Sequence, residues 1–277
     1  MSDTVLLDES DTPLDLRLST LELEQTHGHI TDFIEETVDD ADADGAVLGL
    51  SGGIDSTTVA YLAVEALGAD AVHALVMPGE KNTAENMSDA ERVADDLGVE
   101  YDVVEIEPIA EQFYDALPSA ADVKMAESNV RVRVRAVLGY FAANAENKLM
   151  LGTGNRSEAL TGYFTKYGDQ AVDCNPIGNL YKQQVRQLAD HVGVPRDLVM
   201  KTPSAEMWTG QTDEEEMGLT YDTLDAILAL HIDGELSTAA TVRHLGVSEA
   251  EVERVEELYE ASKHKRAMPP APENVRL

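Results

Sequence analysis

The sequence predicts an α/β fold in which a doubly wound, mostly parallel sheet is flanked by helices. Three observations support it. Short apolar runs alternate with helical patterns through the first half of the chain, one such run leads through a glycine turn into a helix, and the last quarter contains helical patterns alone. Strands that alternate with helices form parallel sheets through right-handed crossovers. The ligand crevice of such a sheet lies beyond the carboxyl ends of its strands.

The expected elements begin with a helix over residues 19–38, because apolar residues recur there at helical spacing and Ser19 or Thr20 can cap its start. The apolar run at residues 46–50 indicates a short buried strand, and residues 54–67 follow with a helical pattern. The same alternation continues, with strands expected at residues 71–77, 101–106 and 148–151 and helices at 86–97, 128–144 and 180–192.

The C-terminal part differs in pattern from the core. Residues 200–217 are polar and acidic and predict a loop, whereas residues 220–262 show helical patterns without strands. No internal repeat or linker interrupts the chain, so one domain is expected over residues 1–277. Its three parts would be an N-terminal helix at 19–45, an α/β core at 46–200, and a loop with helices at 201–277.

The charge balance is strongly acidic, with 53 acidic residues against 20 lysines and arginines and a formal net charge of −33. Such a surface repels phosphate backbones and anionic lipid, so neither nucleic acid nor a membrane is an expected partner. Because the acidic residues are spread along the whole chain, they indicate adaptation to high salt. An acidic start and a single cysteine, Cys174, favour a cytoplasmic location.

The strongest local motif lies between the first strand and the helix that follows it. It comprises Gly49, Leu50, Ser51, Gly52, Gly53, Ile54, Asp55 and Ser56. Consecutive small residues allow backbone N–H groups to converge on an anion at a helix N-terminus, and phosphate is the expected guest. Asp55 stands where a Walker loop has lysine, an arrangement that a bridging Mg²⁺ would make favourable. Glycine turns of this kind are often only structural, but the flanking serines and the aspartate favour function.

A second polar segment, residues 152–188, follows the strand expected at 148–151. Its polar side chains include Thr153, Asn155, Glu158, Lys166, Asp169, Asp173 and Lys182. This mixture suits a polyanionic ligand together with a metal ion. Ten of the 20 cations fall in this and other candidate site segments: Arg131, Arg133, Arg135, Arg156, Lys166, Lys182, Lys201, Lys263, Lys265 and Arg266. On a helix only some of the three alternating arginines can face one site, and Arg133 is the one we expect to do so.

The first motif resembles SGGxDS, the pyrophosphate-binding loop of the N-type ATP pyrophosphatases. These enzymes have an adenine nucleotide alpha hydrolase-like fold and cleave ATP between its α and β phosphates. NAD synthetase, the GMP synthetase ATPase domain, asparagine synthetase and tRNA-thiolating enzymes share the loop. The segment 152–188 resembles the NAD synthetase pattern G-T-x-N-x-x-E, then G-Y-x-T-K-x-G-D, then P-I-x-x-L-x-K, and similar blocks run in that family's order from about residue 25 to 268.

The resemblance implies an ammonia-dependent ligase that converts deamido-NAD (nicotinic acid adenine dinucleotide) to NAD. ATP would adenylylate the nicotinate carboxylate with release of pyrophosphate, and ammonia would then displace AMP. Only 48 residues precede Gly49, too few for a glutaminase domain, so free ammonia or a separate protein is the expected nitrogen source, and Cys174 is not expected to be a nucleophile. Relatives are homodimers, so the resemblance also implies a homodimer.

Site residues follow from the resemblance by position. The implied ATP contacts are Gly49 to Ser56, Thr153, Lys182 and Ser204. The implied magnesium ligands are Asp55 and Glu158, and Asp55 and Lys182 would be catalytic. The implied deamido-NAD contacts are Arg133, Lys166, Asp173, His264 and Lys265, the last two forming a C-terminal lid. The chain departs from the pattern after the second strand, where it lacks a common arginine for which Lys81 is the candidate substitute.

Two other functions stay open. A different member of the superfamily, such as a GMP synthetase ATPase subunit or a tRNA-modifying adenylylase, would share the loop, although an RNA substrate normally requires a basic surface. A non-catalytic adenine-nucleotide-binding regulator would be expected to lack Asp55 or Glu158, and both are present. The site residues therefore favour the synthetase.

Overall fold

The computed structural model describes residues 14–79, 84–121, 123–202 and 213–272. Within this part, four strands form one parallel sheet: β1 (Ala46–Gly49), β2 (Val72–Val76), β3 (Glu100–Val103) and β4 (Leu149–Leu151). The strand order is β3-β2-β1-β4. The chain therefore builds outward from β1 through β2 to β3 and then returns to place β4 on the other side of β1. This reversal creates a topological switch point between β1 and β4, where a ligand crevice is expected.

Both faces of the sheet are buried at β1, β2 and β4, as is usual for a parallel sheet, whereas the edge strand β3 is largely exposed. Successive strand residues point to opposite faces. Leu48 and Leu151 belong to a core cluster on one face, whereas Val47, Leu75 and Met150 belong to a cluster on the other. The apolar runs of β1, β2 and β4 are continuous for this reason, since both faces of these three strands are covered.

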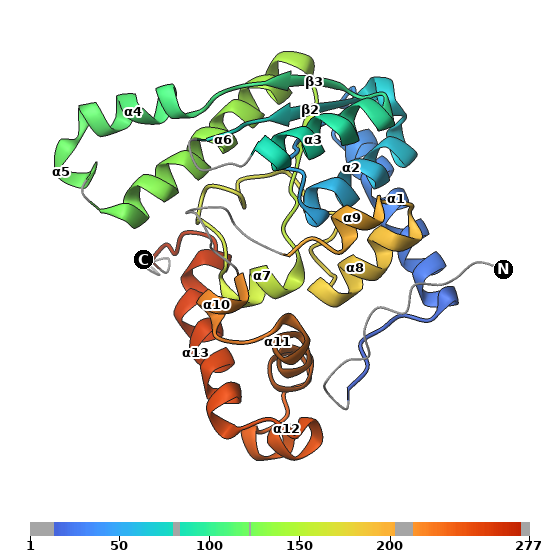
Figure 1. Ribbon diagram of the computed structural model, residues 1–277, viewed down its shortest axis with the longest axis vertical. Helices are drawn as coiled ribbons and strands as arrows, with labels where there is room; N and C mark the ends of the chain where they lie inside the picture. Colours follow the sequence, from blue (N-terminus) through green and yellow to red (C-terminus); the bar gives the residue numbers. More distant parts are fainter. Residues whose placement is uncertain (1–13, 80–83, 122, 203–212, 273–277) are drawn as a thin grey trace, which may run out of the picture.

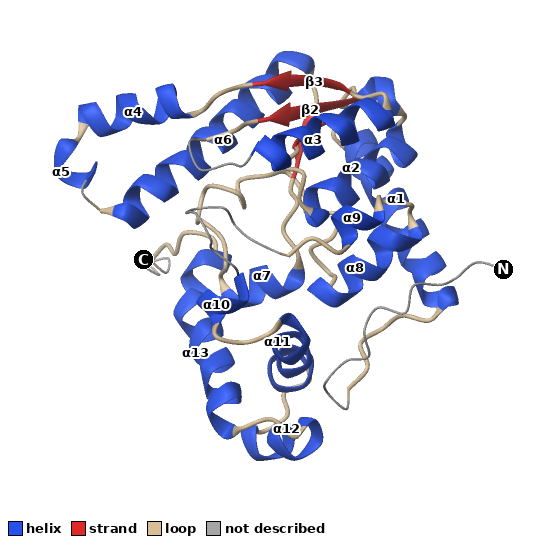
Figure 2. Cartoon of the chain, in the orientation of Figure 1, coloured by secondary structure: helices blue, strands red, loops and turns tan. Residues whose placement is uncertain are grey.

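Helices cover both faces (Figures 1 and 2). The helices that supply the first core cluster are α1 (Thr20–Asp40), α2 (Ile54–Leu67), α3 (Ala84–Leu97), α8 (Lys182–His191) and α9 (Arg196–Val199). The opposite face is covered by α4 (Glu107–Ala116) and α6 (Lys124–Glu146), with the short α5 (Pro118–Ala121) between them. Figure 1 shows that α4, α5 and α6 extend beyond the sheet as an arm.

The C-terminal helices form a separate cluster with its own apolar core. Its elements are α10 (Asp213–Met217), α11 (Tyr221–Ile227), a π-helical segment (Leu228–Asp233), α12 (Thr238–Leu245) and α13 (Glu249–Arg266). The cluster packs against the sheet layer through α7 (Arg156–Thr161) and α8, because α13 contacts α7 and α11 contacts α8. None of the helices in the described ranges is long and apolar enough to cross a membrane.

Several element boundaries follow directly from local signals. Ser19 caps α1 with a reciprocal bond to Glu22, and α2 begins at Ile54 and is ended by Gly68 at a φ of 82°, as expected. Other expectations were wrong in extent. The third strand ends at Val103, and the chain turns into α4 and α5, which the apolar pattern did not predict.

The long helix expected from Ser128 already begins at Lys124, because Val123 accepts backbone hydrogen bonds from the next turn. The acidic segment expected to be only a loop contains α10. Tertiary contacts hold this helix, since Tyr221 donates its backbone N–H to Glu214 at 2.9 Å and its hydroxyl to Asp213 at 3.0 Å.

Candidate active site

A cavity of about 780 Å³ opens beyond the carboxyl ends of β1 and β4. Its walls are formed by residues 49–51 and 53–56, by α6, by residues 162–166, 168 and 169, and by the end of α13. Gly52, an expected ATP contact, does not line it. The sheet core, the arm and the C-terminal helices therefore meet around one space. This is the crevice expected from the reversal of strand order.

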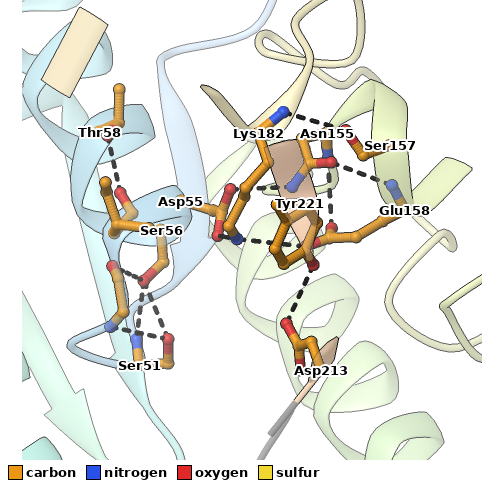
Figure 3. A network of polar contacts seen from close by, with 12 residues as sticks. Ser51, Asp55, Ser56, Thr58, Asn155, Ser157, Glu158, Lys182, Asp213 and Tyr221 are labelled. Atoms are coloured by element: carbon orange, nitrogen blue, oxygen red, sulfur yellow. Dashed lines mark hydrogen bonds and ion pairs between the residues drawn. The ribbon is translucent and has the colours of Figure 1, made fainter. Parts of the chain in front are cut away.

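The loop between β1 and α2 is held in shape by its own serines (Figure 3). The two hydroxyl oxygens of Ser51 and Ser56 lie 3.0 Å apart, and Ser56 Oγ also accepts the Ser51 N–H at 3.2 Å. Gly52 has a φ of 74°, a conformation that favours glycine. Gly53 is the N-cap of α2 and provides no side-chain cap. The first N–H groups of α2 are therefore directed at the cavity as an anion site.

A buried ion cluster stands beside this loop. Lys182, only 2% exposed, donates from Nζ to Asp55 Oδ2, and its Nζ lies 3.5 Å from Glu158 Oε1. Asn155 connects the two carboxylates, because its Nδ2 donates to Asp55 Oδ1 at 3.0 Å while its backbone N–H donates to Glu158 Oε2 at 3.3 Å. Figure 3 shows these side chains converging from α2, α7 and α8. Asp55 follows β1 and Glu158 follows β4, so adjacent strands bring them together as expected.

The cluster carries an excess of negative charge. Burial raises the pKa of the Glu158 carboxyl, and the carboxylates of Asp55 and Asp213 add to the rise, whereas the Lys182 ammonium acts in the opposite direction. Burial alone lowers the pKa of Lys182, but Asp55 and Glu158 outweigh it and raise that pKa well above its ordinary value. One lysine thus faces three carboxylates, and a cation with oxygen ligands would balance them.

The donor set fits a magnesium ion held jointly by protein and ligand. Across the residues that the structure describes, no three His, Cys, Asp or Glu side chains converge on one point as a closed metal site. Asp55 and Glu158 provide two carboxylates at the edge of an anion-binding loop. Mg²⁺ commonly takes one or two protein carboxylates and completes its shell with phosphate oxygens and water.

Two further residues, Tyr221 and Asp213, complete the cluster. The ring of Tyr221 lies under the Lys182 ammonium, with Nζ 5.4 Å from the ring centre. The Tyr221 hydroxyl donates to Asp213, which is 4% exposed and lines the cavity. Both come from the C-terminal helices, more than a hundred residues after the loop. The acidic run at 213–216 favours a solvated loop over a metal site, but Asp213 is buried in the cluster, and its contact with Tyr221 exists only in the tertiary structure.

The opposite wall contains the expected dinucleotide contacts. Arg133, Lys166, His264 and Lys265 all line the cavity. Lys166 donates to the backbone oxygen of His264. Lys265 Nζ donates to the backbone oxygens of Gly162 at 2.7 Å and of Phe164 at 2.8 Å. These bonds join the 162–169 loop to the end of α13, which is where the expected lid would lie.

The three alternating arginines of α6 differ from the expectation in how many of them line the cavity. Arg131, Arg133 and Arg135 all reach the cavity wall, because the cavity extends along α6 instead of meeting it at one point. Arg131 is paired with Glu107 at 2.7 Å, and Arg135 donates to the Met77 oxygen at 3.0 Å. The prediction that Arg133 alone faces the site was therefore wrong.

Asp173 does not line the cavity. Its carboxylate accepts the Met150 N–H at 2.8 Å and the Tyr140 hydroxyl at 3.1 Å, at the side of β4. Cys174 is half-buried, and burial raises the pKa of its thiol to about 11, which agrees with an unreactive cysteine.

Other site expectations are partly accounted for. Thr153 lines the cavity, whereas Ser204 and Lys81 lie outside the described residues. Asp169 also lines the cavity, and burial raises the pKa of its carboxyl to about 6.

Comparison with known proteins identifies the family. The sequence pattern of the NAD synthase family matches residues 26–269. The chain belongs to this family. It is 62% identical to the NH(3)-dependent NAD(+) synthetase of Halobacterium salinarum over 94% of this chain and 97% of that protein. It is 48% identical to the enzyme of the same name from Archaeoglobus fulgidus over 90% and 97% of the two chains.

Solved structures agree with the fold. The NH3-dependent NAD synthetase of Campylobacter jejuni, in complex with a nitrate ion, superposes with a TM-score of 0.77 at 30% identity, covering 91% of this chain and 99% of that one. NMN synthetase of Francisella tularensis gives a TM-score of 0.81 at 34% identity, covering 92% and 99%. The expected family and α/β fold are confirmed, and the regulator and the other superfamily members are set aside.

Proposed function

We propose that the cavity carries out the amidation of deamido-NAD by ammonia, with ATP as the activating substrate. The observation that carries this proposal is the ion cluster of Asp55, Glu158 and Lys182 beside an anion-binding loop, at one end of a cavity whose other wall is cationic. Family membership and 62% identity to an NH(3)-dependent NAD(+) synthetase support the activity. The reaction is the last step in forming NAD and joins carbon to nitrogen.

ATP would lie with its phosphates against the loop at residues 49–56. The N–H groups at the start of α2 and the helix dipole favour the negative charge of the phosphates. Thr153 and Lys182 line the same end of the cavity. Lys182 is buried and fixed by two carboxylates, so its positive charge needs little reorganisation to stabilise charge that develops on the α-phosphate.

Mg²⁺ would be held by Asp55 and Glu158 together with phosphate oxygens. When bound, the ion supplies positive charge that offsets both the carboxylates and the phosphates. Asp55→Asn removes one ligand while keeping a similar shape, so it should impair activity far more than folding. Near-parental turnover by that variant at saturating Mg²⁺ would contradict the assignment.

The two chemical steps make different demands on the chain. In the first, a nicotinate carboxylate oxygen bonds to the α-phosphorus and the bond to the β-phosphate oxygen breaks, releasing pyrophosphate. In the second, ammonia bonds to the carboxyl carbon, AMP leaves with the linking oxygen, and the nitrogen loses a proton. Arg133, Lys166, His264 and Lys265 would bind the anionic deamido-NAD so that its nicotinate reaches the ion cluster.

We further propose a homodimer formed through the arm. Large apolar side chains are exposed on or beside α4, α5 and α6, with Val137 68% and Phe141 75% exposed. Others in this group are Phe113, Leu117, Val123 and Met125. Exposed apolar side chains gathered on one part of a chain with a net charge of −33 mark an interaction surface. Because α6 also supplies Arg133 to the cavity, a second copy docked here would lie next to the site.

One assay tests the activity. The purified chain is incubated in molar KCl with ATP, Mg²⁺, ammonium and deamido-NAD, and we expect NAD, AMP and pyrophosphate. Glutamine in place of ammonium should support no synthesis. Nicotinic acid mononucleotide is the comparison acceptor, because the similar Francisella structure is that of an NMN synthetase. ADP and orthophosphate as primary products, or a preference for the mononucleotide, would contradict the proposal.

A further inference from the structure

A buried carboxylate outside the cavity joins the two helices that carry Glu158 and Lys182. Asp225 lies on α11, is 0% exposed and does not line the cavity. One of its oxygens accepts the Ser157 hydroxyl at 2.5 Å, and the other accepts the Gln183 N–H at 3.0 Å. Ser157 directly precedes Glu158, and Gln183 directly follows Lys182.

The contacts continue to the backbone of Lys182 itself. Ser157 Oγ accepts the Lys182 N–H at 3.0 Å (Figure 3). The hydroxyl therefore donates to Asp225 and accepts from the first residue of α8. Lys182 and Gln183 provide the first two N–H groups of α8, which have no partner within that helix. Ser157 and Asp225 therefore satisfy both groups from other elements, in place of a side chain from the preceding residue.

Helix α11, which carries Asp225, also contacts the side chain of Lys182. Tyr221 lies one turn before Asp225 on α11, and its ring faces the ammonium of Lys182 at 5.4 Å. One turn of α11 thus controls both ends of the lysine. Asp225 acts on its backbone through Ser157, and Tyr221 acts on its charged group.

A second carboxylate repeats the arrangement nearer the surface. Asp233, at the end of the π-helical segment, accepts a hydrogen bond from Arg156 Nε at 2.7 Å and another from the Tyr181 hydroxyl. Arg156 is the first residue of α7, and Tyr181 is the residue just before α8. The C-terminal cluster therefore contacts the starts of α7 and α8 at two points, through the buried Asp225 and through the partly exposed Asp233.

We propose that Asp225 is a positioning residue, which sets the first turns of α7 and α8 against each other so that Glu158 and Lys182 meet Asp55 in reactive geometry. The proposal rests on the proposed function for its consequence on catalysis. A carboxylate is suited to this place because it accepts two hydrogen bonds and its charge is favoured by two helix N-termini. Asparagine has a similar shape, but its NH₂ group cannot accept one of these bonds.

Four variants test the proposal: Asp225→Asn, Ser157→Ala, the double variant, and Thr241→Val as control. Thr241 is also fully buried in the C-terminal cluster, and its hydroxyl donates only within α12, to the Ser237 oxygen at 3.2 Å. Its removal costs a buried hydrogen bond that involves neither α7 nor α8. All four are assayed at one high salt concentration, well below their melting temperatures.

We expect Asp225→Asn and Ser157→Ala each to lower kcat by about 10- to 100-fold, the usual effect of removing a group that orients a site residue. KM for ATP and for deamido-NAD should change less than about threefold, because no contact to either substrate is lost. The double variant should be no worse than the poorer single variant, since both changes interrupt one path. The control should lose a similar amount of melting temperature and keep its kcat.

Several outcomes would overturn the proposal. One is a kcat of Asp225→Asn within twofold of the parent. Another is an equal loss of kcat in the Thr241→Val control at an equal decrease in melting temperature. A third is a double variant whose loss of kcat is the product of the losses in the two single variants. If Asp225→Asn does not fold, Ser157→Ala alone decides, because it breaks the same path with a smaller change.

Hydrogen exchange without substrates separates this proposal from the proposed function. Asp225→Asn should accelerate exchange of the Lys182 and Gln183 amides and leave those of α12 unchanged. Accelerated exchange together with a parent chain that makes no NAD would refute the proposed function and keep the positioning role. Unchanged exchange at these amides would refute the positioning role whatever the activity.

Discussion

Replacement of Lys182 by methionine removes the only positive charge of the described ion cluster while keeping a side chain of similar length. The lysine Nζ bonds to Asp55, lies 3.5 Å from Glu158 and is 2% exposed. The variant would leave these carboxylates facing each other and Asp213 without compensation. Both the stability of the fold and the charge presented to the α-phosphate should therefore change.

The size of the effect follows from the geometry. At 3.5 Å and an effective dielectric constant of about 20, the attraction between Lys182 and Glu158 is about 5 kcal/mol. Desolvation of the buried lysine offsets part of this attraction, and removing one partner of a buried pair typically costs about 3–5 kcal/mol. We expect the free energy of unfolding to fall by that amount without Mg²⁺. Loss of a preorganised charge at the reacting phosphate should lower kcat by about 10²–10³-fold.

The assay combines denaturant unfolding in high salt with steady-state NAD synthesis. Lys148→Met is the matched control, because Lys148 is largely buried, pairs with Glu146 at 2.8 Å and does not line the cavity. It should keep its kcat and lose less stability. If Lys182→Met retains a tenth of the parental kcat, or unfolds at the same denaturant concentration as the parent, the role of the ion cluster is refuted.

Three further predictions concern salt, pH and assembly. The melting temperature without substrate should rise with KCl, because the screening length falls from about 10 Å at 0.1 M to about 3 Å at 1 M and self-repulsion falls with it; a flat curve would contradict a salt-adapted surface. Burial raises the pKa of Asp225 from 3.8 to about 7, although the hydrogen bonds from Ser157 and Gln183 act to lower it. The folded chain therefore binds the extra proton, and stability should decrease from about pH 4 to pH 7; denaturant titrations should show a smaller decrease in Asp225→Asn, and an equal one would refute this origin. Phe141→Asp should shift the sedimentation coefficient from dimer to monomer, whereas an unchanged coefficient would exclude the arm as the interface.

Local patterns were sufficient for the elements whose signals lie within a few residues of one another. The capping box at Ser19, the glycine at the end of α2 and the continuous apolar runs of the strands are such signals. The loop at residues 49–56 belongs with them, because its shape depends on its own serines and glycines. The family resemblance could be read for the same reason, since its motifs are contiguous.

Contacts between distant elements were decided by the tertiary structure. Asp55 and Lys182 are 127 positions apart, and they meet because β4 pairs with β1 and α8 returns to the same strand ends. The sequence placed Asp173 with the other substrate contacts, but pairing beside β4 directs its carboxylate to Tyr140 and away from the cavity.

The same limit applies to Asp225. In the sequence it is indistinguishable from the other acidic residues of an acidic chain. Its neighbours in sequence indicate neither its burial nor the two groups, on Ser157 and Gln183, that donate hydrogen bonds to it. The sequence by itself therefore determined the family, the alternation of strands and helices, and the residues that supply the chemistry. The tertiary structure decided which residues hold that chemistry in place, because hydrogen bonds between α7, α8 and α11 exist only once the C-terminal helices have packed against the sheet layer.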